Sequence, residues 1–159
     1  MKKSRAVLTL ALVGGTALVS QAIGSPDDRG YWHLQTSVYT RHFSPSPEHT
    51  NRQNLIGIER NEASGWIYGA ATFRNSFGQQ SVYTYGGKQF ESEDHPFYVK
   101  LSGGLLYGYK GEYRDKIPFN RYGVAPALIP SVGIRVDPIT AELVLLGSSA
   151  AMVNMGFRF

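Results

Sequence analysis

The sequence contains no cysteine, so a disulfide framework and a thiolate metal site are both excluded. It has no long helical period, and no apolar run reaches the roughly 20 residues that a membrane-spanning helix needs. Its 159 residues suffice for one domain with a core or a small closed barrel, and are few for two. The absences therefore favour a single domain built from strands.

The one strongly apolar stretch lies at the N-terminus. Lys2, Lys3 and Arg5 precede the run "AVLTLALVGGTALVS", and small residues follow it with the spacing of a cleavage site. This order predicts a secretory signal peptide over residues 1–24. A membrane anchor or a buried helix is disfavoured because the run is short and has two glycines at its centre. We expect residues 25–159 to form the mature domain.

The excess of positive charge belongs mostly to this leader. The chain has a formal net charge of +4, and removing the leader's three basic residues, with no acidic one, leaves +1. The rest of the chain has no dense cluster of Lys and Arg, so nucleic acid is not an expected partner.

Beyond the leader, apolar and polar residues alternate with the period of a β-strand. The segment "FYVKLSGGLLY" turns Lys100 and Ser102 to one face, and its other face carries Phe97, Val99, Leu101 and Leu105. The segments "ITAELVLL" and "VNMGFRF" likewise oppose an unbroken apolar face to a face with one charge, from Glu142 and Arg158 respectively. Each segment therefore has one face suited to lipid or to a core.

Two folds fit this alternation, a soluble sandwich and a membrane barrel. Export, aromatic residues near segment ends and segment lengths close to those of tilted spanning strands favour the barrel. We count eight segments, an even number as a closed up-and-down barrel requires, at residues 31–43, 54–61, 66–75, 80–90, 97–108, 121–136, 139–147 and 150–159. The predicted fold is all-β, an eight-stranded antiparallel up-and-down transmembrane β-barrel integral to the bacterial outer membrane.

The connections between segments predict the orientation of this barrel. Those after the second, fourth and sixth segments are short and should face the periplasm, whereas those after the first, third and fifth are longer or more polar and should face outward. Eight strands leave room for side chains or one slender ligand. The inward charges would then have to pair in a structural network, and they are Glu59, Lys100, Glu142 and Arg158.

A polar interruption in "AATFRNSFGQQSVYTY" raises the possibility of a nucleophile. The third segment ends near Ser76 and the first ends near His42, so both residues should lie at the outer rim, where an imidazole could take the proton of the hydroxyl. His33 and His95 should lie toward the opposite end, which leaves His49 as the alternative base. An ordinary polar rim fits the same residues.

Strict alternation would place His42 on the lipid face and Arg41 inside. The pairing of His42 with Ser76 therefore requires the first strand to twist, bulge or end early, which the nearby Ser44-Pro45 makes plausible.

The signal peptide, the eight-segment pattern, "FRNSF", "KIPFNRYGVAPALIPSVGI" and the terminal "MGFRF" together resemble the lipid A palmitoyltransferases of the bacterial outer membrane. The resemblance covers most of the mature chain and is distant. It implies a small barrel that moves a palmitoyl chain from a phospholipid to lipid A without a cofactor or a metal. We identify the chain as a divergent relative, in which the helix that precedes the family's barrel has no room.

The resemblance also implies a set of site residues. The family's histidine corresponds to His42 and its Asp-Ser pair to Asn75 and Ser76, so that an amide replaces the carboxylate and can orient a group only by hydrogen bonding. Prolines that interrupt strand pairing, and so admit lipids sideways, correspond to Pro118, Pro126 and Pro130, although each also fits an ordinary strand edge or loop. Among the basic residues of the outer loops, the expected binders of lipid phosphates are Arg74, Arg41 and Arg114.

Three functions remain open on these residues. The first is transfer of a palmitoyl chain, through a covalent acyl-enzyme or directly, with membrane lipids as partners and a monomeric barrel. The second is a lipid A deacylase with water as acceptor. The third is a non-enzymatic outer-membrane barrel, either a narrow solute channel or a structural protein.

Overall fold

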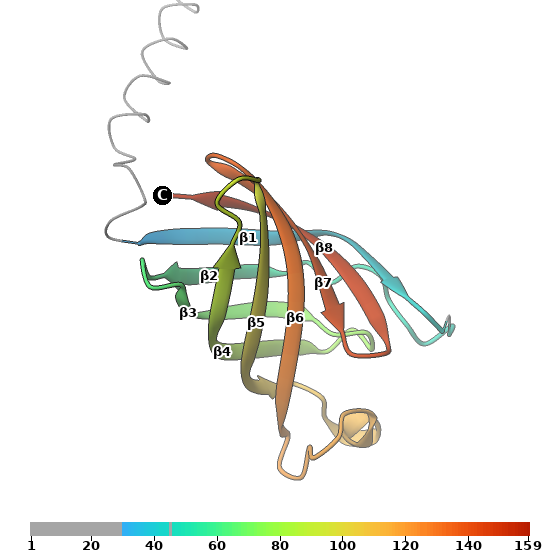
Figure 1. Ribbon diagram of the computed structural model, residues 1–159. Coiled ribbons are helices and arrows are strands. Elements are labelled where there is room, and N and C mark those ends of the chain that lie inside the picture. Colours follow the sequence, from blue (N-terminus) through green and yellow to red (C-terminus); the bar gives the residue numbers. More distant parts are fainter. Residues whose placement is uncertain (1–29, 45) are drawn as a thin grey trace, which may run out of the picture.

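The alternating segments pair in sequence order and close into an antiparallel barrel (Figure 1). In this computed structural model, the described residues are 30–44 and 46–159. The eight strands are β1 (Tyr31–His42), β2 (Ile56–Asn61), β3 (Trp66–Arg74), β4 (Gln80–Glu91), β5 (Phe97–Tyr107), β6 (Val124–Val136), β7 (Ile139–Leu146) and β8 (Ala150–Arg158). The predicted signal peptide, residues 1–24, lies outside the described residues. Within the described ranges, no helix is long and apolar enough to cross a membrane.

The predicted fold class is confirmed, and the strand bounds differ from the prediction by a few residues. The largest difference is at β6, which begins at Val124 and not at residue 121, because Gly123 bends the chain with a φ of 80°. A short 3₁₀ helix, η1 (Gly111–Lys116), interrupts the long connection between β5 and β6. Closure comes from the antiparallel pairing of β1 with β8, in which His33 lies opposite Arg158.

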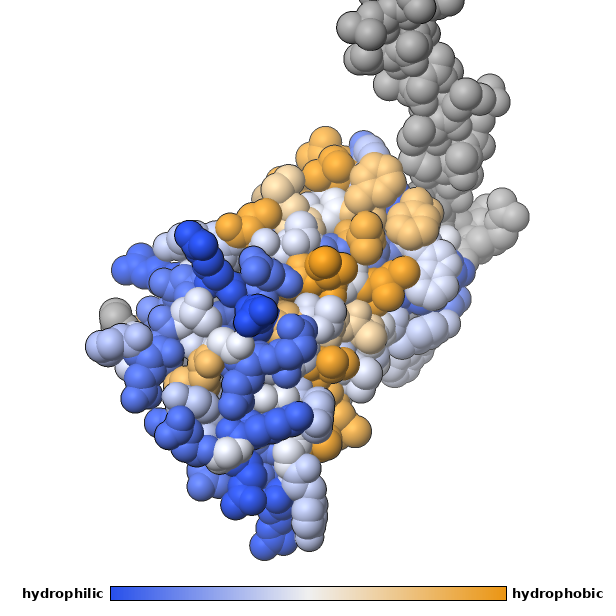
Figure 2. Space-filling view, turned by 180° about the vertical axis from the view of Figure 1, so that it is seen from behind, coloured by the Kyte–Doolittle hydropathy of each residue, from blue (hydrophilic) through white to orange (hydrophobic). Residues whose placement is uncertain are grey.

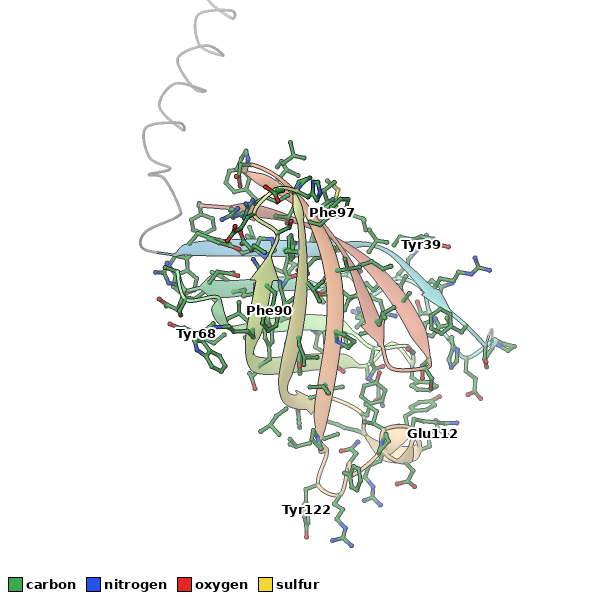
Figure 3. The ribbon with its side chains drawn as sticks, in the orientation of Figure 1. Tyr39, Tyr68, Phe90, Phe97, Glu112 and Tyr122 are labelled. Atoms are coloured by element: carbon green, nitrogen blue, oxygen red, sulfur yellow. The ribbon has the colours of Figure 1, made fainter. Side chains whose placement is uncertain are left out.

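The two ends of the barrel differ, as the connection lengths predict. The turn end carries the connections 62–65, 92–96 and 137–138, and the loop end carries the connections 43–55, 75–79, 108–123 and 147–149. The last of these is short although it lies at the loop end. Figure 3 shows Glu112 and Tyr122 on the long 108–123 loop, far from Tyr68, Phe90 and Phe97.

The outer wall of the barrel is apolar. Its exposed side chains include Leu34, Ile58, Leu101, Val132 and Leu143, one from each of five strands. Figure 2 shows this hydrophobic band across the wall and hydrophilic residues gathered at the loop end. In the bilayer core, backbone groups must find their partners within the protein, and a closed sheet provides them. The fold is therefore that of a transmembrane barrel.

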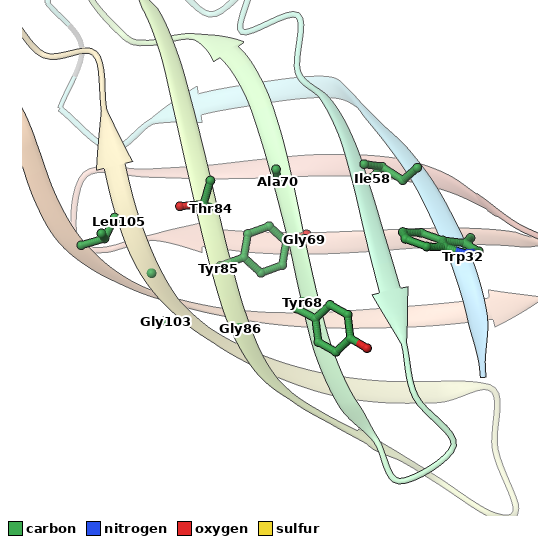
Figure 4. Close-up of a pocket in the computed structure, with 11 residues that line it drawn as sticks. Trp32, Ile58, Tyr68, Gly69, Ala70, Thr84, Tyr85, Gly86, Gly103 and Leu105 are labelled. Carbon is green, nitrogen blue, oxygen red and sulfur yellow. The ribbon is translucent and has the colours of Figure 1, made fainter. Parts of the chain in front are cut away.

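One part of the outer wall is hollowed by small residues. Ala70, Thr84 and Gly86 of β3 and β4, with Gly103 of β5, leave a shallow groove on the lipid-facing side (Figure 4). Larger side chains, among them Trp32 and Tyr68, line the same groove. The wall is therefore uneven, and Ala70 lies on the outside of β3.

Two seams of the barrel are only partly paired. β6 pairs with β5 from Val124 to Ile134, but it pairs with β7 only from Ser131 onward. Pro126 and Pro130 lie in the half of β6 that lacks β7 as a partner, and neither can donate a backbone hydrogen bond. β1 likewise pairs with β2 only up to Thr36. Both unpaired stretches lie toward the loop end.

The middle of the lumen holds a buried ion cluster. Lys100 Nζ contacts Glu59 Oε1 at 2.9 Å and Glu142 Oε1 at 2.5 Å. The Tyr85 hydroxyl and the Asn61 amide also donate to Glu59, each at 2.9 Å. The predicted pairing of inward charges is thus confirmed for three of the four residues. Arg158 joins no cluster member and contacts Asp137 at the turn end, with 2.8 Å between Nη1 and Oδ1.

The cluster yields a test of stability. Replacing Lys100 by Ala leaves two buried carboxylates without their shared cation, and we expect the free energy of unfolding to fall by about 3–5 kcal/mol. The matched control is Lys88→Ala, which removes an exposed bond to the Ser64 carbonyl and should cost less than about 1 kcal/mol. Urea titration in lipid vesicles, followed by tryptophan fluorescence, measures both. Equal losses in the two variants would contradict the structural role of the cluster.

Candidate functional site

A β-bulge turns His42 into the barrel. Ser37 pairs with Asn154 and Tyr39 pairs with Val153, so Val38 is an extra residue without a partner on β8. An extra residue reverses the inside-outside alternation of all that follow it. His42 is consequently buried and Arg41 is exposed. The predicted irregularity in the first strand is confirmed, and the placement of Arg41 inside by strict alternation is wrong.

The bulge brings His42 to Ser76. The His42 Nε2 atom lies 2.7 Å from Ser76 Oγ, a hydrogen-bonding distance. Ser76 follows β3 in the tight connection to β4, and its carbonyl accepts a bond from the backbone N–H of Thr50 at 2.8 Å. The juxtaposition at one rim, expected from the sequence, is confirmed by these distances.

The second nitrogen of His42 has its own partner. His42 Nδ1 lies 2.8 Å from Oδ1 of Asn51, which belongs to the 43–55 loop. Sequence reasoning missed this residue, because an asparagine in the polar run "EHTNRQN" carries no pattern that distinguishes it. Ser76, His42 and Asn51 therefore form a continuous hydrogen-bonded row.

His49 stacks on the row and takes no part in it. Its ring centroid lies 4.5 Å from that of His42, with the two planes 30° apart, and its edge faces Phe77. The imidazole that lies within hydrogen-bonding distance of the Ser76 hydroxyl is that of His42, so His42 and not His49 is the neighbour of Ser76. His33 bonds Thr140 deep in the lumen at 2.8 Å, and His95 lies in the 92–96 turn, as expected.

Asn75 organises the turn that presents Ser76. Its Oδ1 accepts the N–H groups of Phe77 and Gln79 at 3.0 Å each, and its Nδ2 donates to Ser81 Oγ at 3.1 Å and the Gly108 carbonyl at 3.4 Å. The side chain is fully buried. Among the described residues, no hydrogen bond joins Asn75 to His42. Asn75 thus lies next to the site in sequence but is placed to hold the loop.

Aromatic residues of the β5–β6 loop pack beside Ser76. Phe77 stacks on Tyr113 of η1, with ring centroids 4.2 Å apart and planes 12° apart. Tyr109 lies next to Ser76, and burial raises the pKa of its phenol. The Lys116 ammonium lies 5.9 Å from the Phe77 ring. The loop therefore covers one side of the row.

A cavity of about 510 Å³ leads from this row into the lumen. His42 and Ser76 line its mouth, and the ion cluster of Glu59, Lys100 and Glu142 lines it as well, deep in the lumen. Apolar side chains form the wall between them, from Leu55, Ala71, Phe73, Val144 and Met152. The cavity is thus open to a slender apolar chain with a polar group at the mouth.

The predicted phosphate-binding residues lie around the rim and not in the row. Arg74 is exposed and donates weakly to the Gly78 carbonyl at 3.4 Å. Arg114 is exposed on η1, 3.7 Å from Asp115, and Arg41 is exposed on the outside of β1. Pro118 lines the cavity from the β5–β6 loop. These residues surround the mouth on several sides.

No family model and no curated protein matches this chain. Solved structures do: a designed transmembrane β-barrel is 10% identical with a TM-score of 0.52, and the alignment covers 82% of this chain and 97% of the design. The backbone structure of the Yersinia pestis outer membrane protein Ail in a phospholipid bilayer nanodisc is 14% identical with a TM-score of 0.44, covering 82% of this chain and all of Ail. The similarity to the design supports the fold alone, an eight-stranded transmembrane barrel.

The role of Asn75 in the turn can be tested by its removal. Asn75→Ala deprives two N–H groups and two oxygens of their partner, and we expect the free energy of unfolding to fall by about 1–3 kcal/mol. The neighbouring Arg74→Ala removes an exposed side chain and should change it by less than about 0.5 kcal/mol. Thermal unfolding in detergent micelles compares the two. A neutral Asn75→Ala would argue against its role as loop organiser.

Proposed function

We propose that the protein is an acyltransferase of the bacterial outer membrane that moves a palmitoyl chain from a phospholipid to lipid A. The observation that carries the proposal is the Ser76–His42 pair at the mouth of an apolar cavity inside a transmembrane barrel. A nucleophile with its base at such a mouth suits an ester whose acyl chain can enter the lumen. The loop end would face the cell exterior, where lipid A resides.

The pair suits two half-reactions. His42 Nε2 takes the proton of the Ser76 hydroxyl, whose oxygen forms a bond to the ester carbonyl carbon of the phospholipid. The bond from that carbon to the glycerol oxygen breaks, and the leaving alcohol receives the proton from His42. In the second half, His42 takes the proton of a lipid A hydroxyl, whose oxygen forms a bond to the acyl carbon. The bond from that carbon to Ser76 Oγ then breaks, and the serine oxygen receives the proton back from His42. The same base serves each direction of proton transfer.

The lumen is suited to measure the acyl chain. A chain whose carbonyl lies at Ser76 would pass Ala71 and Val144 and stop at Lys100, because a methyl end cannot replace the paired charges around that ammonium. The ion cluster would therefore set the greatest chain length.

The partly paired seams offer a way in for lipid. A chain must pass from the bilayer into the lumen through the wall, and a fully bonded wall has no opening. Near the loop end, β6 lacks its β7 partner around Pro126 and Pro130, and β1 lacks a β2 partner beyond Thr36. We assign lipid entry to these seams. The rim cations Arg74, Arg41 and Arg114 would bind lipid phosphates as charge-assisted donors.

The direct test is mass spectrometry of lipid A from cells that make the wild-type protein, Ser76→Ala, His42→Ala or no protein. We expect lipid A heavier by one palmitoyl group with the wild type. That addition should fall by at least about 100-fold in both variants, since nucleophile and base are each required. Arg135→Lys, at the opposite end of the barrel, is the matched control and should retain the addition.

Other results would assign another function. Lipid A that is lighter by one acyl chain only with the wild type would indicate a deacylase with water as the acceptor. Identical lipid A in all five strains would favour a non-enzymatic barrel, provided that the folded protein is present in the outer membrane. Sedimentation in detergent checks the proposed monomer.

The acyl cavity can be tested by two neighbouring alanines of β3. Ala71 faces the lumen and Ala70 faces the lipid, in the groove of Figure 4. Ala71→Leu should narrow the cavity and lower the transfer rate with palmitoyl donors by about 10-fold or more, because a long chain that no longer fits misplaces its ester at Ser76. The transfer rate with the shorter octanoyl donors should be unchanged. Ala70→Leu adds the same atoms outside and should leave both rates unchanged. Equal effects of the two changes would exclude the lumen as the acyl site.

A further inference from the structure

The bond between Asn51 and His42 carries an inference beyond the identity of the nucleophile and its base. We propose that Asn51 is the positioning residue of this site, which holds His42 in the tautomer and orientation that Ser76 requires. The inference rests on the proposed function only in taking His42 as the base. It assigns to Asn51 the role that the family resemblance would give to Asn75.

The atoms in contact determine the tautomer. Asn51 presents Oδ1 to His42 Nδ1 at 2.8 Å, and an amide oxygen only accepts hydrogen bonds. With the amide oxygen as acceptor, we assign the proton to Nδ1. In a neutral imidazole the other nitrogen then has a free lone pair, and this nitrogen, Nε2, lies 2.7 Å from Ser76 Oγ. The ring is thus arranged to accept the serine proton and not to donate one.

The chain holds Asn51 at the correct place through its neighbours. The backbone N–H of Thr50 donates to the Ser76 carbonyl at 2.8 Å. The backbone N–H of Arg74 donates to the Gln53 carbonyl at 2.7 Å. The segment 50–53 is therefore bonded to the strand end and turn that carry the nucleophile. One short segment consequently fixes both the backbone of Ser76 and the ring of His42.

Asn75 is not available for this role. Both ends of its amide are engaged within the turn and with Ser81 and Gly108, and the side chain is fully buried there. Asn51 is exposed in its loop, so its side chain contributes little to packing. Replacing Asn51 should therefore alter the ring of His42 while the barrel remains folded.

A neutral amide orients the imidazole but does not stabilise its protonated form by charge. A carboxylate at the same position would do both, so Asn51→Asp should move the acidic limb of the pH–rate profile to higher pH. The titratable groups that share the cavity mouth with His42 are His49, Tyr109 and Lys116. Nitrogen-15 shifts resolve His42 from His49, so the two titrations can be followed separately.

The experiment uses the exported chain in detergent micelles and an alkyl fluorophosphonate, which modifies an activated serine without requiring lipid A. Wild type, Asn51→Ala, Asn51→Asp and Asn75→Ala are compared, with Glu48→Gln as an exposed control from the same loop. The rate of Ser76 modification and the ring nitrogen-15 shifts of His42 are measured across pH.

We expect a His42 ring protonated on Nδ1 in the wild type, and a mixture of tautomers in Asn51→Ala with a modification rate lower by about 10–100-fold. Asn51→Asp should restore the tautomer and the rate and shift the acidic limb upward. Glu48→Gln should match the wild type, and Asn75→Ala should retain the Nδ1-protonated ring wherever it folds.

An Asn51→Ala protein with the wild-type tautomer and rate would overturn the assignment, as would loss of the tautomer in a folded Asn75→Ala. The failures of the two proposals are distinct. Asn51-dependent modification of Ser76 with unchanged cellular lipid A would support the positioning role and reject the lipid A substrate. Equal acylation of lipid A by wild type and Asn51→Ala would support the lipid A substrate and reject the positioning role.

Discussion

The structure depends on the requirement that a sheet in lipid leave no backbone group without a partner. Pairing eight strands in order and joining β1 to β8 meets that requirement everywhere but at the two partly paired seams. It also makes every strand two-sided, with lipid on one side and lumen on the other. The side to which a residue points is then set by counting along the strand. A single added residue, Val38, changes the count in β1 and brings an imidazole from the outer side to the inner. The candidate site exists because of that one irregularity.

The lumen separates two kinds of environment along its length. Toward the loop end its wall is apolar, with Leu55, Val144 and Met152 among its side chains. At mid-height a buried ammonium lies between two carboxylates, and each charge has a partner, as burial demands. The ion cluster marks the inner end of the cavity, and the hydrogen-bonded row of Ser76, His42 and Asn51 lies at its mouth.

Much of the fold was predictable because a barrel repeats one simple rule. Thr140 and Glu142 alternate with Ile139 and Leu143 in the sequence. In β7 the first two are buried in the lumen and the other two are exposed on the outer wall. The approach of His42 to Ser76 was predictable from strand direction, and the need for a twist, a bulge or an early strand end followed from the wrong parity of His42. The position of the bulge was not, because Val38 is an ordinary strand residue whose displacement comes from its pairing with β8.

Loop contacts were harder to predict than strand contacts. Asn51 lies nine positions from His42 in a loop without periodicity, and its bond depends on the three-dimensional course of that loop. Asn75 is predicted as a site residue because it precedes the serine and stands at the position of the family's aspartate. Adjacency in sequence gives no side-chain direction in a tight turn, and there the amide is directed to Ser81 and Gly108.

The mid-height ion cluster has a consequence for the cell that holds such a barrel. A hollow cylinder through a protective membrane is a potential leak, and the proposed enzyme, which would have to admit a fatty chain, could not simply fill its interior. The ion cluster of Glu59, Lys100 and Glu142 lies across the lumen below the mouth of the cavity, where it would obstruct solutes while the apolar part above it stays open to the proposed acyl chain. Such a barrel could be hollow without making its membrane porous.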